Sequence, residues 1–187
     1  MTDKLISKNP AIIETPRLIL REVDIEADLD MWTDMMSDEE TVRYIGGETL
    51  DRAQSWRQIA LMIGHMQVRG YCFLAVVEKS SGQFIGRIGP WYPEGWPAPE
   101  IGWTLHRDYT RKGYAKEAAS ACVDYAFNTL GWDKVIHVIA HGNIGSIKTA
   151  EAIGSKHIGE LESIPGVTKM PCHIYGQDRP KPSGAKS

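Results

Sequence analysis

A short basic segment, residues 109–118, combines residue types that can bind a phosphate group. It reads Tyr-Thr-Arg-Lys-Gly-Tyr-Ala-Lys-Glu-Ala and leads from a turn into a helical pattern. The free N–H groups at a helix start carry partial positive charge and point the same way, so they can bind phosphate oxygens. Gly113 lets the backbone approach an anion closely, and Arg111, Lys112 and Lys116 add full charges. On its own, this segment fits either a pyrophosphate site or an ordinary turn with solvated cations.

The composition is that of one folded domain. The chain of 187 residues is 42% hydrophobic and contains six tryptophans, which is enough apolar material for a core. The formal net charge is −3 and there is no long Lys/Arg run, so we do not expect nucleic acid as the main partner. No apolar stretch is long enough to cross a bilayer and the polar start is unlike a signal peptide, so no membrane partner is expected either.

The cysteines and histidines give no sign of a metal site. Cys72, Cys122 and Cys172 are widely spaced and form no C-x-x-C pair. Such cysteines are typical of reduced, buried thiols, which predicts a cytoplasmic protein. The six histidines show no ligand spacing with them, so the sequence predicts no metal.

The chain divides into a loosely ordered leader (1–12), a single folded unit (13–176) and a flexible tail (177–187). Apolar periodicity and turn residues predict the secondary structure of the folded unit. The expected strands are 13–22, 71–78, 83–89, 100–105, 134–140, 157–161 and 171–175, and the expected helices are 27–36, 50–68, 113–130 and a short one between 143 and 154. Residues 90–99 form a proline-rich aromatic loop, and a further loop surrounds Pro165 and Gly166. This order indicates an α/β fold with a mixed sheet of six or seven strands.

The motifs in this order resemble the Gcn5-related N-acetyltransferases (the GNAT family), and within them the ribosomal-protein N-terminal acetyltransferase-like (RimJ/RimL) branch. The resemblance is carried by Glu-Ile-Gly-Trp-Thr-Leu at 100–105, Tyr109-x-x-Lys-Gly-Tyr-Ala-x-Glu-Ala, Asn143-x-x-Ser146 and Gly154, and it covers residues 14–176. It implies a largely antiparallel mixed sheet, flanked by about four helices and splayed between its central strands. It also implies acetyl-CoA as cosubstrate and no metal.

The resemblance assigns the coenzyme site to three segments. The pantetheine arm would pair with an open strand edge, the pyrophosphate would lie on the basic turn, and a third segment would hold the arm near the sulfur. These segments are Trp103, Thr104 and Leu105; Arg111, Lys112, Gly113, Tyr114, Ala115 and Lys116; and Asn143 with Ser146. Members usually have Gly where Arg111 stands, so Arg111 needs a negative φ or a strained backbone. They also usually carry an aromatic residue in place of Ser155.

Acetyl transfer needs a base for the amine, a donor for the thioester carbonyl and an acid for the leaving sulfur. Glu100 is the candidate base, directly or through water, and the Trp103 or Thr104 backbone N–H is the candidate donor. Ser146 is the candidate acid. Glu100 also fits a solvated carboxylate at a strand end, and Asn143 with Ser146 also fits a simple helix cap.

The acceptor pocket is expected among the aromatic residues of the least regular segments, which are Trp32, Tyr44, Trp91 and Trp96. Trp91 and Trp96 also fit a role at the core edge or in a dimer contact, and for either residue alone that role is favoured over substrate contact.

We therefore expect an acetyl-CoA-dependent N-acetyltransferase that acts by direct transfer on a peptide N-terminal α-amine, as a monomer or homodimer. Two alternatives stay open. One is a small-amine acetyltransferase for polyamines or aminoglycosides, for which the acidic residues between 28 and 40 would line the cleft. The other is a non-catalytic acyl-CoA sensor with the same fold.

Overall fold

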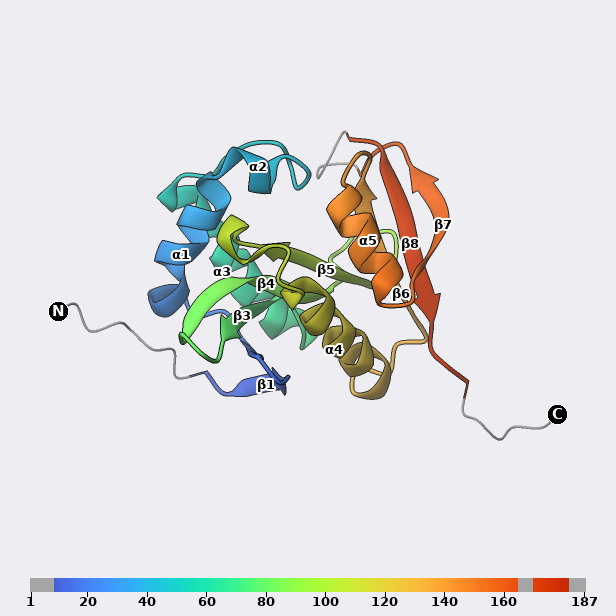
Figure 1. Cartoon of the computed structure of the whole chain (residues 1–187), viewed down its shortest axis with the longest axis horizontal. Helices are drawn as coiled ribbons and strands as arrows, with labels where there is room; N and C mark the ends of the chain where they lie inside the picture. Colours follow the sequence, from blue (N-terminus) through green and yellow to red (C-terminus); the bar gives the residue numbers. More distant parts are fainter. Residues whose placement is uncertain (1–8, 165–169, 182–187) are drawn as a thin grey trace.

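An eight-stranded sheet runs through the computed structural model, which describes residues 9–164 and 170–181 (Figure 1). The strand order is β1-β2-β3-β4-β5-β6-β8-β7. Its first five strands form a continuous antiparallel ladder: β1 (Ala11–Glu14), β2 (Leu18–Arg21), β3 (Leu74–Glu78), β4 (Gln83–Trp91) and β5 (Glu100–Leu105). The last three form a second antiparallel ladder: β6 (Lys134–Ala140), β7 (Lys156–Leu161) and β8 (Cys172–Asp178).

The two ladders meet at a splayed junction. β5 and β6 run parallel and share a single register pair, Glu100 with Ile136. Beyond Glu100 the two strands separate, which confirms the expected splay between the central strands. Alternate backbone groups along the rest of β5 therefore lose their partners on that side.

Helices cover both faces of the sheet. In the described residues they are α1 (Ile25–Ser37), α2 (Glu39–Val42), α3 (Arg52–Arg69), α4 (Tyr114–Asn128) and α5 (Ile144–Ala152), with a 3₁₀ turn η1 at Arg107–Tyr109. Each start has a local cause: Asp24 caps α1, and Asp51 forms a capping box with Gln54 at the start of α3. Figure 1 shows α4 and α5 crossing in front of the sheet.

Alternating side chains divide the core into two layers. Leu74, Val76 and Ile101 point to the α4 face and pack with the small-residue stripe of that helix. Phe73 and Ala75 point to the opposite face and pack with α1 and α3. Side chains alternate between the two faces along every strand, and paired residues of neighbouring strands share a face. The same alternation therefore decides which side chains of β5 meet which helix layer.

The first strand is a correction to the sequence prediction. Residues 13–22 do not form one strand; β1 and β2 form a hairpin, and Thr15 N–H donates to the Leu18 carbonyl at 3.0 Å. Pro16 lies in the turn between them, where its lack of an N–H costs no ladder hydrogen bond. β1 takes up residues 11–12 of the expected leader, and β8 takes up 177–178 of the expected tail. Residues 1–8 and 182–187, and the expected loop at Pro165 and Gly166, lie outside the described residues.

β4 is longer than predicted. It runs on through Pro90 and Trp91, which we expected in the aromatic loop. Pro90 is tolerated because its partner Ile101 turns its carbonyl away from β4, towards His137 of β6, so the Pro90 pair needs no N–H. The split of the first strand brings the sheet to eight strands, against the six or seven expected, and α2 adds a helix that the sequence did not indicate.

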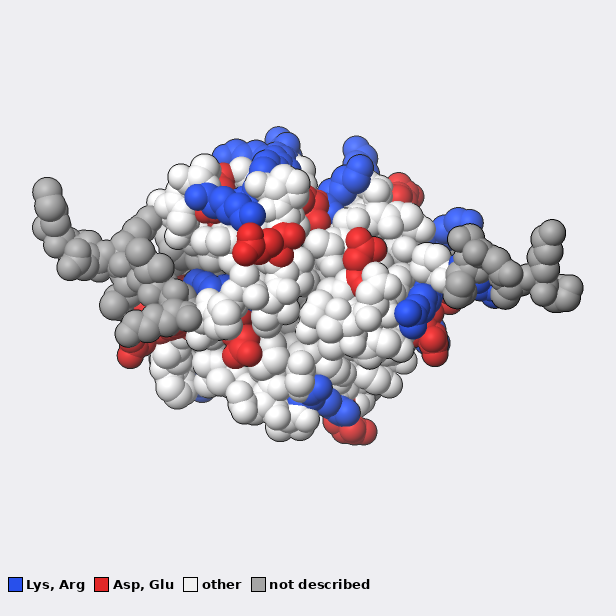
Figure 2. Space-filling view, turned by 90° about the horizontal axis from the view of Figure 1, so that it is seen from below, with Lys and Arg blue, Asp and Glu red and all other residues white. Residues whose placement is uncertain are grey.

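The surface carries charges of both signs. Figure 2 shows one face, on which Lys, Arg, Asp and Glu side chains are scattered between broad uncharged areas. None of the helices in the described ranges, 9–164 and 170–181, has the length and hydropathy to span a membrane.

Candidate active site

The basic turn before α4 has the conformation of an anion site. Gly113 is the N-cap of α4 with φ 82°, and no side chain in the described part of the chain caps the helix, so its first N–H groups stay available to a ligand. Arg111 has φ 60° and is the one non-glycine residue with positive φ among those described. A left-handed conformation costs a side-chain-bearing residue about 1–2 kcal/mol. The strained alternative for Arg111 is therefore correct, and the turn keeps its shape at that cost.

Arg17, between β1 and β2, holds this turn in place. Its Nε donates to Glu117 Oε2 at 2.6 Å and its Nη1 donates to the Lys112 carbonyl at 2.9 Å. The guanidinium also lies 4.3 Å from the ring centroid of Tyr114. Sequence reasoning missed Arg17, because it is about a hundred residues away in the chain.

The other side chains of the basic turn are partly anchored and partly exposed. The Lys112 ammonium lies 4.9 Å from the Tyr109 ring centroid, and the buried Tyr114 donates its hydroxyl proton to Glu78. Arg111 and Lys116 are exposed and Ala115 is partly buried on the first turn of α4. Two full cations thus remain in solvent beside the free N–H groups.

The open edge of β5 lies beside this turn. The Ile101 carbonyl accepts from His137 Nδ1 at 2.6 Å, so Ile101 directs its backbone groups towards β6. Because alternate residues of a strand face the same neighbour, Trp103 and Leu105 direct theirs into the gap, whereas those of Thr104 face Arg87 on β4. The alternation favours Trp103 over Thr104 as the donor to a thioester carbonyl.

Trp103 also reaches across the gap through its side chain. Its indole N–H donates to Ser146 Oγ at 3.1 Å. Asn143 Oδ1 accepts from the Ser146 backbone N–H at 3.1 Å, so Asn143 does cap α5 as the simpler alternative predicted. The Ser146 hydroxyl proton remains available for donation, because the oxygen is the acceptor in the contact with Trp103.

Glu100 is a buried carboxylate at the point where the gap opens. Its Oε1 accepts from the Val138 backbone N–H at 3.0 Å and its Oε2 accepts from the Trp96 indole at 2.6 Å. Burial raises the pKa of Glu100 to about 7, although these hydrogen bonds and the charge of Arg87 act in the opposite direction. The alternative of a solvated carboxylate is therefore wrong, since Glu100 is 6% exposed.

A buried polar network lies beside the junction of β5 and β6. His137 bridges the strands through the Ile101 carbonyl, and its Nε2 contacts Ser155 Oγ at 2.8 Å. Burial lowers the pKa of His137 to about 4, so the ring is neutral at pH 7. Gln177 donates to the same Ser155 oxygen at 2.9 Å. Ser155 thus joins His137 and Gln177 in one polar network.

The expected acceptor residues are not one group. Trp32 is fully buried and its indole donates to Gln58 at 2.8 Å, so its expected role in the pocket is corrected to a core role. Trp91 is 8% exposed and stacks on His65 at 4.5 Å, at the edge of the core. Trp96 is partly exposed over Glu100, and Tyr44 is partly exposed beside Gly142 of the β6–α5 turn. Trp96 and Tyr44 therefore remain as acceptor candidates.

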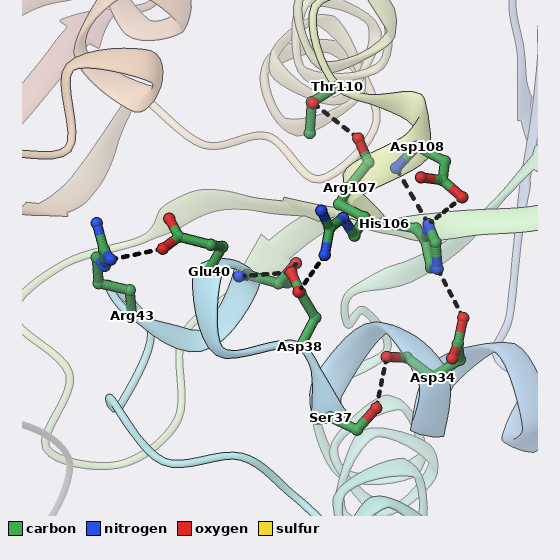
Figure 3. Close-up of polar contacts among 10 residues, drawn as sticks. Asp34, Ser37, Asp38, Glu40, Arg43, His106, Arg107, Asp108 and Thr110 are labelled. Atoms are coloured by element: carbon green, nitrogen blue, oxygen red, sulfur yellow. Dashed lines mark hydrogen bonds and ion pairs between the residues drawn. The ribbon is translucent and has the colours of Figure 1, made fainter.

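A polar network ties α1 and α2 to the end of β5 (Figure 3). His106 Nε2 contacts Asp34 Oδ2 at 2.8 Å, and Arg107 Nη1 donates to Asp38 Oδ1 at 3.0 Å. Thr110 Oγ1 then donates to the Arg107 carbonyl at 2.8 Å. The network links the helices beside Tyr44 to the residues that enter the basic turn.

The site residues come from both faces of the sheet. Trp103 and Ser146 lie on the face of α4 and α5, as does the basic turn. Glu100 and Trp96 lie on the other face. Glu100 and Gly102 are two residues apart on β5 and so point the same way, and Gly102 lies against Phe73 in the opposite core layer. The two sets meet at the gap between β5 and β6, so this arrangement can bring together a coenzyme from one side and an amine from the other.

Comparison with known proteins identifies the family. The acetyltransferase (GNAT) domain model matches residues 17–156. The chain belongs to the GNAT family of acetyltransferases. A Bacillus subtilis (strain 168) protein named YkkB is 30% identical over 142 residues, which cover 75% of this chain and 82% of that protein. An N-acetyltransferase named p20 from Bacillus licheniformis is 27% identical over 149 residues, which cover 79% of this chain and 83% of p20.

Solved structures share the fold. An acetyltransferase from Agrobacterium tumefaciens str. C58 superimposes with a TM-score of 0.76 at 26% identity, covering 94% of this GNAT chain and 98% of its own. RimL, a ribosomal L7/L12 α-N-protein acetyltransferase in complex with coenzyme A, gives a TM-score of 0.75 at 13% identity, covering 90% of this chain and 98% of its own. At that identity the likeness to RimL shows the fold alone.

The residues present fit acetyl-CoA. The uncapped helix start at Gly113 suits a pyrophosphate, and the open edge at Trp103 and Leu105 suits the amides of a pantetheine arm. This GNAT protein is therefore an acetyltransferase that uses acetyl-CoA.

Proposed function

We propose that this GNAT protein transfers an acetyl group directly to the α-amine of a peptide or protein N-terminus. The observation that carries the proposal is the pair of groups on the acceptor face: a buried carboxylate, Glu100, and a buried arginine, Arg87. Acetyl-CoA supplies the thioester, and the residues of this chain supply a base, a hydrogen-bond donor and an acid.

Glu100 suits the role of base. A carboxyl group with a pKa of about 7 is half ionised near neutral pH, where an α-amine of pKa about 8 is about one-tenth neutral. A lysine side chain, with a pKa near 10.4, is less than about one-thousandth neutral at that pH. One carboxylate is therefore better matched to an α-amine than to an ordinary lysine.

Arg87 favours a peptide over a simple polyamine. Its guanidinium is buried against Phe73, 4.3 Å from the ring centroid, and its Nε has no hydrogen-bond partner among the described residues. A peptide N-terminus has a carbonyl oxygen a few bonds from its amine, which Arg87 can bind. A polyamine has no acceptor group and carries the same charge as Arg87, so it would be repelled.

The other roles follow from the gap. The Trp103 backbone N–H donates to the thioester carbonyl, and the Ser146 hydroxyl donates its proton to the leaving sulfur. Asn143 orients Ser146 through the cap of α5, and its side-chain N–H₂ group makes no hydrogen bond to another described residue, which leaves it for the pantetheine arm. We expect this chemistry to take place in the cytoplasm, with the enzyme as a monomer or homodimer.

A small cationic amine is the second candidate, and one observation favours it. A hollow of about 470 Å³ next to α2 is lined by residues that include two exposed acids, Glu39 and Glu48. Acidic groups beside Tyr44 would attract a polyamine or aminoglycoside. Arg43 lies in the same hollow and opposes that attraction, so the peptide acceptor is the better supported.

The test is thiol release from acetyl-CoA with N-terminal peptides, free lysine, polyamines and aminoglycosides, with a calorimetric titration of coenzyme A alongside. We expect the parent enzyme to turn over with peptides. In Arg87→Lys, the KM for peptides should increase and the KM for other amines should not. Glu100→Gln should lower kcat by about 100-fold or more and abolish the acid limb of the pH profile, with coenzyme binding retained. Turnover confined to polyamines or aminoglycosides would contradict the peptide assignment, and turnover with none of these amines would contradict the proposed chemistry.

A further inference from the structure

Three histidines surround one carboxylate where the end of β6 meets β7 and β8. His141 follows β6, His157 and Glu160 lie on β7, and His173 lies on β8. Both His141 Nε2 and His157 Nε2 contact Glu160, at 2.8 and 2.7 Å. His173 Nδ1 contacts the same carboxylate at 2.9 Å. The proposed acetyl transfer uses none of these four side chains.

A bulge in β7 creates this arrangement. In a regular strand, residues three apart point to opposite faces, so His157 and Glu160 would be separated by the sheet. The register between β7 and β8 shifts between His157 and Gly159, and the extra residue returns Glu160 to the face of His157. Glu160 then stands directly opposite His173 in the ladder.

The rings are held by packing as well as by Glu160. The rings of His141 and His173 stack at 4.1 Å with an interplanar angle of 27°. His157 packs edge-on against His173 at 5.4 Å and against Tyr175 at 5.5 Å. Their nitrogens therefore converge on one point, the Glu160 carboxylate, instead of pointing separately into solvent.

We propose that His141, Glu160 and His173 bind one divalent transition-metal ion, such as Zn²⁺, with His157 available as a fourth ligand. One donor atom from each of the first three residues lies within 4.8 Å of the others. Donors around one tetrahedral Zn²⁺ are about 3.3 Å apart, because Zn–N and Zn–O bonds are about 2.0–2.1 Å long. Small side-chain rotations bring the three donors to that spacing.

The ligand chemistry selects the class of ion. Imidazole nitrogen together with one carboxylate suits Zn²⁺, Ni²⁺, Co²⁺ or Cu²⁺, whereas Ca²⁺ and Mg²⁺ prefer oxygen ligands alone. The carboxylate already contacts all three imidazole rings, so the oxygen and nitrogen donors of the site lie together. The side chains of His141, Glu160 and His173 are 48%, 47% and 28% exposed, so an ion can enter from solvent.

The site would join three separate segments. One ion would connect the end of β6 to β7 and β8, and β7 is the last strand at its edge of the sheet. His141 also lies two residues before Asn143, the cap of α5. The bound state is therefore expected to be more resistant to unfolding than the metal-free state.

The test is a calorimetric titration of Zn²⁺ into the full chain, prepared without a histidine tag and freed of metal with a chelator. We expect one Zn²⁺ per chain, and affinity at least about tenfold weaker in Glu160→Gln and in His173→Ala. Glu162→Gln is the matched control, because it removes an exposed carboxylate just beyond β7 and leaves the cluster intact. It should bind Zn²⁺ as tightly as the parent chain.

A second measurement covers the case in which a variant unfolds. Co²⁺ added to the parent chain should give the visible absorption of a four-coordinate site, and one equivalent of Zn²⁺ should remove it. Zn²⁺ should also raise the melting temperature of the parent and of Glu162→Gln. Absence of one-to-one binding, or equal affinity in the parent and in His173→Ala, would overturn the proposal.

Discussion

The indole N–H of Trp96 donates to Glu100 Oε2 across 2.6 Å, from a loop that stands only four residues before it in the chain. This bond stabilises the ionised carboxylate, whereas burial stabilises the protonated one. The loop between β4 and β5 thus helps to set the pH at which Glu100 becomes a base.

Removing that donor should move the pH profile. In Trp96→Phe the pKa of Glu100 rises, so the acid limb of kcat/KM shifts to higher pH and the rate at pH 7 falls by about two- to tenfold. Trp56→Phe, on an exposed part of α3, is the control and should keep the parent profile. A Trp96→Phe profile that overlays the parent would separate this bond from catalysis.

Glu100 should also affect stability in a pH-dependent way. Its pKa is raised from 4.5 to about 7, so the folded chain binds more protons than the unfolded chain between these pH values. Its contribution is therefore most favourable below pH 4.5 and is lost as the pH rises towards 7. The shift corresponds to about 3 kcal/mol.

Urea unfolding at a series of pH values checks this sign. The free energy of unfolding of Glu100→Gln, relative to the parent, should increase by up to about 3 kcal/mol between pH 4 and pH 8. A constant difference across that range would mean that Glu100 ionises normally.

The strain at Arg111 can be measured with two substitutions that remove the same charge. Arg111→Gly relieves the left-handed backbone, whereas Arg111→Ala keeps a Cβ at φ 60°. We expect the glycine variant to be more stable than the alanine variant by about 1 kcal/mol, after the entropy of glycine in the unfolded chain is included. Thermal unfolding measures the difference, and equal stabilities would show that the turn is not strained at this residue.

Arg17 should affect coenzyme binding without taking part in the chemistry. Arg17→Ala removes the contacts to Glu117 and to the Lys112 carbonyl, so the turn loses its support. We expect coenzyme A to bind about tenfold more weakly, with kcat at saturation little changed. Arg52→Ala removes a comparable surface ion pair, with Asp30, and should bind coenzyme A normally. Equal affinities in the two variants would argue against the role of Arg17.

The cysteines should be dispensable for turnover. Burial raises the pKa of Cys72 to about 12 and also raises the pKa of Cys122 and Cys172, so none is a thiolate at neutral pH. Alanine at each position should leave kcat within about twofold, although Cys122→Ala should cost stability in the core. A stable acetyl-cysteine detected by mass spectrometry would contradict direct transfer.

Local signals explain what could be predicted from the sequence. The conformation of the basic turn and the start of α4 depend on residues close together in the sequence, Gly113 above all. The observed bounds of β5 and β6 are those that the sequence predicted. Trp32 was placed wrongly because a single helix does not reveal which of its faces the core covers. Arg17 depends on a contact between distant segments, and no spacing rule indicates it.

The histidine cluster shows the limit of spacing arguments most clearly. His141, His157 and His173 recur every sixteen residues, a separation that matches no short metal motif. His157-x-x-Glu160 would normally put its two side chains on opposite faces of a strand. Only the bulge between His157 and Gly159 unites them, and a glycine in a strand pattern allows a bulge without fixing the register there.

The single register pair between β5 and β6 has a consequence for how the protein opens. Each ladder is complete within itself, and backbone hydrogen bonds contribute little to their union. Cooperativity between the two halves therefore depends on side chains, chiefly α4 packed over β4 and β5 and the bridges from Glu100 and His137. Amide hydrogen exchange should then resolve two protected blocks that lose their protection at different denaturant concentrations, with β6, β7 and β8 behaving as a unit of their own.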